Sequence, residues 1–179
     1  MARIFTSLAL FALALMAAAL VLGLVLGDIH GRREPDVLRW ATIHRLSGMA
    51  AALAIVLVDC IGMTYFIGTG RWCREVVETY ELSPDLIARS VALKRRAFPW
   101  AILSLLTVIA VGALGAAADP ATGRIGTQSW VVIHLSCALL GFAFIAAAFF
   151  MQVQQIAAHH QVIDEIVAEV RRIREARGL

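Results

Sequence analysis

Four long runs of apolar residues, separated by polar segments, organise the chain. They cover residues 4–27, 40–68, 99–118 and 130–151. A helix of about 20 residues rises about 30 Å, the thickness of the hydrocarbon core of a bilayer, so each run is long enough to cross a membrane. The pattern predicts an all-α integral membrane protein, a single domain over residues 1–179 with four transmembrane helices.

The first run could be mistaken for a cleaved signal peptide. The apolar part of a signal covers about 7–15 residues, and this run is longer. A patch of small residues at 17–19 lies in the middle of the run, with more apolar residues after it. We therefore expect an uncleaved membrane anchor.

Two charged segments, residues 71–97 and 152–177, are expected to be cytoplasmic and helical. In the first, Ser83, Pro84 and Asp85 favour the start of a new helix, because they supply a cap, a preset backbone and an acid at the positive dipole end. The second carries apolar residues at helical spacing, namely Ile163, Ile166, Val170 and Ile173. This apolar stripe is expected to pack on the other cytoplasmic helix, or else to form a short coiled coil between two copies of the chain.

Composition and charge indicate the orientation. Apolar residues make up 60% of the chain and charged residues 16%, whereas soluble domains have about half and about a quarter. The two charged segments hold ten Arg and Lys residues, and the opposite loops with their helix starts hold five. The positive-inside rule then predicts a multi-pass protein of the cell's inner (plasma) membrane with both termini in the cytoplasm. The net charge of +3 arises mostly from the Arg and Lys residues of these segments, which are expected to be cytoplasmic. We therefore do not expect nucleic-acid binding.

The two halves of the chain resemble each other. Asp28 ends the first span, and Trp40 follows 12 residues later; Asp119 ends the third span, and Trp130 follows 11 residues later. In both halves a histidine comes four residues after the tryptophan and directly after an isoleucine. The pattern predicts two tandem helical hairpins in the same orientation, an up-down-up-down bundle.

The matched histidines, His44 and His134, are the candidate chemistry. They lie at similar depth near the outer face of two parallel helices, which are diagonal neighbours in such a bundle. Two imidazoles facing each other there could ligate one haem iron, with small residues at Gly48 and Ala138 leaving room for the macrocycle and Arg45 pairing with its propionates.

This arrangement resembles b-type cytochromes built on four-helix bundles, in which two parallel, diagonally placed helices each give an axial histidine to haem b. The resemblance implies an electron-transfer subunit with haem b as its cofactor. The chain departs from that pattern because no second histidine pair lies lower in the same helices. Only one haem would fit, and one haem cannot carry electrons across the whole bilayer.

Other interpretations stay open. A histidine near the membrane interface costs little free energy, because its ring can reach the water among the lipid headgroups. Both histidines could therefore be purely structural. They could also form a non-haem metal site at the outer face with Asp28 or Asp119, to which His30 is an optional further ligand. A third possibility is a non-catalytic scaffold or accessory subunit that binds protein partners through its cytoplasmic helices. No hydrolase motif is present, and the protein is not expected to be an enzyme on its own.

Asp59 is the one acid within an apolar run. Its helical stripe continues from His44, and the corresponding stripe of the fourth span ends at Gln152, so a contact between Asp59 and Gln152 is expected. The alternative is a proton or quinone site near the inner face, because ionisable groups inside membranes are costly and often functional.

His159 and His160 are expected on a solvated helix, pointing to different faces. The odd number of cysteines, three, and the lack of a CxxC pair argue against a disulfide framework or a zinc ribbon.

Overall fold

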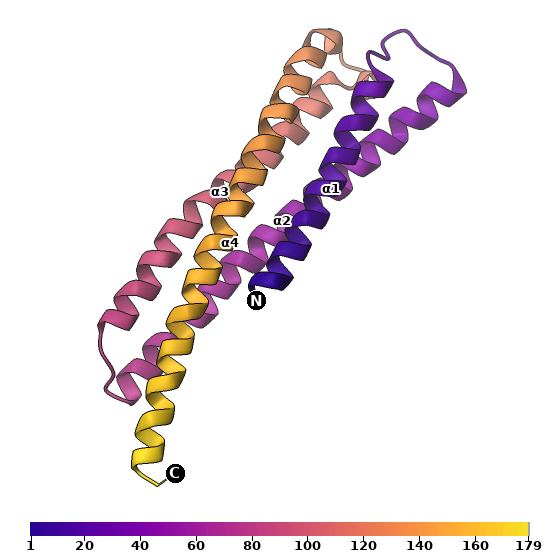
Figure 1. Cartoon of the computed structure of the whole chain (residues 1–179). Helices are drawn as coiled ribbons and strands as arrows, with labels where there is room; N and C mark the ends of the chain where they lie inside the picture. Colours follow the sequence, from indigo (N-terminus) through magenta and orange to yellow (C-terminus); the bar gives the residue numbers. More distant parts are fainter. Residues whose placement is uncertain (179) are drawn as a thin grey trace.

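The computed structural model describes residues 1–178, and that part of the chain is helical, with no strand. Four long helices make up nearly all of it (Figure 1). They are α1 (Ala2–Leu26), α2 (Pro35–Thr79), α3 (Asp85–Ala118) and α4 (Val131–Ala176), and two short 3₁₀ turns, η1 (Pro120–Thr122) and η2 (Thr127–Trp130), precede α4.

All four helices are long and apolar enough to cross a membrane. Large apolar side chains cover their outer faces, as Leu53 and Leu140 show with 70% and 72% of their surface exposed. Such a surface is unfavourable in water and suits contact with lipid chains. The expectation of an all-helical protein with four membrane-capable helices is confirmed, and it indicates a multi-pass membrane protein.

The connections between the helices lie at two opposite ends of the molecule (Figure 1). Residues 27–34 and 119–130 lie together at one end, which we call the loop end. Residues 80–84 join α2 to α3 at the other, which we call the link end. Each helix packs on the next along the chain, and α1 also packs on α4. Between them lies an apolar core that includes Phe5, Ile145 and Phe149, the two rings meeting edge to face at 6.1 Å.

The first helix is much shorter than the other three. It has 25 residues, whereas α2, α3 and α4 have 45, 34 and 46. Towards the link end only these three continue, and they enclose a second apolar cluster made of Cys73, Val77, Leu86, Val162 and Ile166. Ile163 and Val170 pack against this cluster. The predicted apolar stripe of the C-terminal segment therefore packs on the other helices of its own chain.

Candidate functional site

His44 lies on α2 with its ring against α1. Its Nδ1 atom is 3.0 Å from the backbone oxygen of Ala19. A Cβ atom added at Gly23 would come within 2.9 Å of the His44 Cε1 atom, so the ring fills the space that a glycine leaves. The carbonyl can only accept a hydrogen bond, so it holds the proton on Nδ1 and leaves Nε2 with a free lone pair.

His134 repeats this arrangement on the second pair of helices. A Cβ atom at Gly115 of α3 would come within 3.0 Å of the His134 Cε1 atom. Its buried Nδ1 atom faces the backbone carbonyl of Val111, although the pair falls short of hydrogen-bond geometry. In both halves the facing carbonyl belongs to the residue four positions before the glycine. Both histidines thus pack in the same way on the preceding helix.

The other residues predicted around a haem lie as follows. Ala138 is buried, and nothing lies within 4 Å of a Cβ atom placed at Gly48. Arg45 forms an ion pair with Asp119 at 3.1 Å and also donates to the hydroxyl of Thr42. Arg45 therefore already has an acidic partner, one supplied by the second half of the chain.

A polar cluster joins the two loops at the loop end. His30 contacts Asp28 through Nδ1 at 2.6 Å and the hydroxyl of Thr127 through Nε2 at 2.7 Å. Gln128 donates to the second oxygen of Asp28. The hydrogen bonds from the backbone N–H and the ring of His30 lower the pKa of Asp28 to about 2. Both ring nitrogens of His30 are engaged within this cluster, and His44 does not belong to it.

The alternative metal site at the outer face needed His44 and His134 together with Asp28 or Asp119, with His30 as an optional further ligand. Within residues 1–178 no three potential metal-binding side chains of His, Cys, Asp or Glu come together. The structure brings together Asp28 and His30 only, while Asp119 is paired with Arg45.

Comparison with known protein families, with curated proteins and with solved structures finds no match to this chain. The case for a function therefore depends on the residues themselves.

The expected contact between Asp59 and Gln152 is present in the buried core. The Gln152 amide donates to Asp59 Oδ1 at 2.8 Å, and the two side chains are 0% and 1% exposed. The hydroxyl of Ser104, also fully buried, faces the same carboxyl group from α3. Neither Asp59 Oδ2 nor Ser104 Oγ has a partner that meets hydrogen-bond geometry. The buried cluster of Asp59, Ser104 and Gln152 thus lacks some of the hydrogen bonds that its polar atoms could form.

The expectation for His159 was wrong, because this residue is fully buried rather than solvated. Its Nε2 atom is 2.8 Å from the hydroxyl of Ser90, and its Nδ1 atom is 3.2 Å from the hydroxyl of Tyr65. The ring of Phe66 packs edge-on against it at 5.2 Å. His160, its neighbour, is exposed as expected. His159 therefore ties α2, α3 and α4 together beyond the end of α1.

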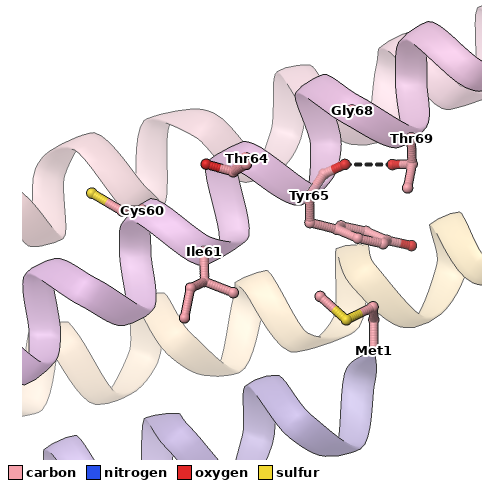
Figure 2. Close-up of a pocket in the computed structure, with 7 residues that line it drawn as sticks. All are labelled: Met1, Cys60, Ile61, Thr64, Tyr65, Gly68 and Thr69. Carbon is pink, nitrogen blue, oxygen red and sulfur yellow. Dashed lines mark hydrogen bonds between the residues drawn. The ribbon is translucent and has the colours of Figure 1, made fainter.

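Tyr65 also borders a pocket of about 430 Å³ beside the start of α1. Figure 2 shows the ring of Tyr65 extending from α2 with the side chain of Met1 near it, while Cys60 and Thr64 line the same pocket. Thr69 donates to the backbone oxygen of Tyr65 at 2.6 Å. The side chain of Tyr65 thus borders an open pocket and also contacts the buried His159 through its hydroxyl.

Burial makes His159 a source of acid sensitivity. Loss of water, and then the nearby His160, lower the pKa of His159 below its usual value of 6.5. Below that value the unfolded chain takes up a proton that the folded chain resists, so this contribution to stability is present above about pH 6.5 and is lost as the pH falls towards the lowered pKa. We expect the melting temperature of the wild type to fall between about pH 7.5 and about pH 5.5.

Thermal melts at several pH values check this expectation. His159→Gln, which stays neutral and keeps polar atoms near Tyr65 and Ser90, should have a flatter profile over the same range. His160→Gln is the matched control and should melt with the wild-type pH dependence. Equal profiles for the wild type and His159→Gln would contradict the assignment.

Proposed function

We propose that this chain is a membrane-embedded b-type haem subunit for electron transfer. It holds one haem near the outer face of the inner membrane, with His44 and His134 as the two axial ligands. The four spans form two tandem hairpins in an up-down-up-down bundle, and both termini lie in the cytoplasm. In this arrangement the loop end faces outward and the link end faces the cytoplasm.

The observation that carries the proposal is the equivalent setting of the two histidines. A histidine that ligates a metal generally directs its other ring nitrogen to a backbone carbonyl or carboxylate, which fixes the tautomer and the ring orientation. His44 is bonded in this way to Ala19, and His134 faces Val111 with the same nitrogen. The hydrogen bond of His44 thereby keeps its Nε2 atom for an iron atom, and the same ring setting would present Nε2 of His134 to it.

The surrounding residues fit a haem in two respects. Gly23 and Gly115 let the rings lie close to the neighbouring helices, which holds the imidazoles in place. Gly48 and Ala138, one turn further along their helices, carry little or no side chain, which would leave room for the macrocycle. A haem held by two histidines would supply one-electron transfer, and its potential would depend on these ligands and on the apolar surroundings.

Arg45 has a defined role in this proposal. Its guanidinium is held at the loop end by Asp119, close to the turn that carries His44. From there it would pair with the propionates of a haem, which would share it with Asp119. Since a single haem near one face cannot span the bilayer, the chain acts together with redox partners, and the cytoplasmic helices are the surface proposed for protein partners.

An optical spectrum of the purified protein tests this function. We expect a reduced-minus-oxidised spectrum of the b type with about one haem per chain, since only one histidine pair is present. A colourless preparation that contains no iron would overturn the proposal and favour an accessory subunit without a cofactor. A colourless preparation with bound zinc or copper would overturn it in favour of the non-haem metal site.

A further inference from the structure

The group around Asp59 lacks any positive partner. Asp59 is 0% exposed, and the two side chains that approach its carboxyl group, Ser104 from α3 and Gln152 from α4, are uncharged. The ion pairs among residues 1–178 all lie elsewhere. An ionised carboxylate buried without a cation costs several kcal/mol even after relaxation of its surroundings.

Charge, not the number of hydrogen bonds, distinguishes the two forms of Asp59. The Ser104 hydroxyl can donate to Oδ2 of a carboxylate, and Oδ2 of a neutral acid can donate to Ser104 Oγ, so either form can pair these two atoms. In both forms Oδ1 accepts from Gln152. Only the neutral acid makes these contacts without placing an uncompensated charge in the buried core.

A bound metal ion fits the same atoms poorly. Ca²⁺ takes about 6–8 oxygen ligands. Only Asp59 Oδ2 and Ser104 Oγ lack partners at this point, and one nitrogen, from Gln152, already occupies the other carboxylate oxygen. A proton needs one acceptor and one donor, which matches what the group offers.

We propose that Asp59 is a proton-binding site in the membrane-embedded core, holding one proton at neutral pH that its Oδ2 atom donates to Ser104. Binding is a simple protonation: the carboxylate oxygen gains H⁺ from water, and no bond other than O–H forms. The bound proton joins α2 to α3 while Gln152 joins α2 to α4. Loss of the proton leaves an uncompensated charge at the junction of the three helices.

Infrared spectroscopy of the purified full-length protein tests the site without reference to any haem. We expect the carbonyl band of a protonated carboxylic acid at neutral pH, with an intensity of one group per chain and a downshift in D₂O. Asp59→Asn should remove this band. The variant should still fold, because asparagine keeps an acceptor for Gln152 and a donor for Ser104.

Two further variants sharpen the result. Ser104→Ala removes the acceptor, so the band should persist at a higher frequency. Asp85→Asn changes an exposed acid at the start of α3 and should leave the band unchanged. Absence of an acid band in the wild type, or its persistence in Asp59→Asn, would overturn the proposal, as would a band that does not move in D₂O.

Discussion

Replacement of either His44 or His134 by alanine is expected to leave less than about a tenth of the wild-type haem content, because loss of even an outer-shell partner of a ligand costs about 10–100-fold in affinity. Each variant keeps the neighbouring glycine and carbonyl, so the loss would come from the ligand itself. The measurement is haem per chain after purification. His160→Ala, at an exposed position, should bind haem like the wild type.

The glycines beneath the rings extend this prediction. Valine at position 23 or 115 would force the His44 or His134 ring from its place, because even a Cβ atom there comes within 2.9 or 3.0 Å of the ring. We expect haem content in both variants to fall nearly as far as in the alanine variants. Gly112→Val is the matched control, since a Cβ atom at this exposed position of α3 meets nothing within 4 Å. Normal haem content in Gly23→Val and Gly115→Val would contradict the proposed ring positions.

Leucine at position 62 is expected to give the largest loss of stability. A Cβ atom at this buried glycine would lie 2.9 Å from Gln152 Oε1 and 3.0 Å from the ring of Phe5. Overpacking costs about 1–3 kcal/mol, and leaving a buried polar group unpaired costs about 1–3 kcal/mol more. If leucine also displaces Gln152 from Asp59, the combined loss is on the order of 3 kcal/mol or more.

Thermal or denaturant unfolding in detergent measures this loss. Gly68→Leu places the same side chain on the same helix at an exposed position with open space around it. It should unfold like the wild type to within about 0.5 kcal/mol. Equal stability of Gly62→Leu and Gly68→Leu would show that α1 and α4 do not pack closely against α2 at Gly62.

The long helices were predictable because hydropathy and helix length are local properties of the sequence. The run at residues 4–27 nearly coincides with α1, whereas α2 and α4 extend beyond the runs at 40–68 and 130–151, to Thr79 and Ala176. Ser83 and Pro84 correctly placed the break before α3. The third run was predicted from Pro99, and the observed helix continues through this proline from Asp85, because a membrane-type helix tolerates the lost N–H.

The sites were only partly predictable, because they depend on contacts between helices. Asp59 and Gln152 could be paired because each lies on a helical stripe facing the other half. His159 was misplaced by judging it with its neighbour His160, although it lies on the stripe of Gln152, Ile156 and Ile166 and could have been found there. The contacts of His44 and His134 with glycines depend on side-chain rotamers and helix spacing, which no periodicity encodes.

Some polar residues of the first half take partners from the second half, and this sets an order for biogenesis. Arg45 is synthesised 74 residues before Asp119, and Asp59 is synthesised 93 residues before Gln152. The Nε2 atom of His30 likewise contacts the hydroxyl of Thr127, which is synthesised 97 residues later. While the chain emerges from the ribosome, the contacts of Arg45 with Asp119 and of Asp59 with Gln152 cannot form until the second half has been made. The two halves of the chain therefore complete these contacts only together.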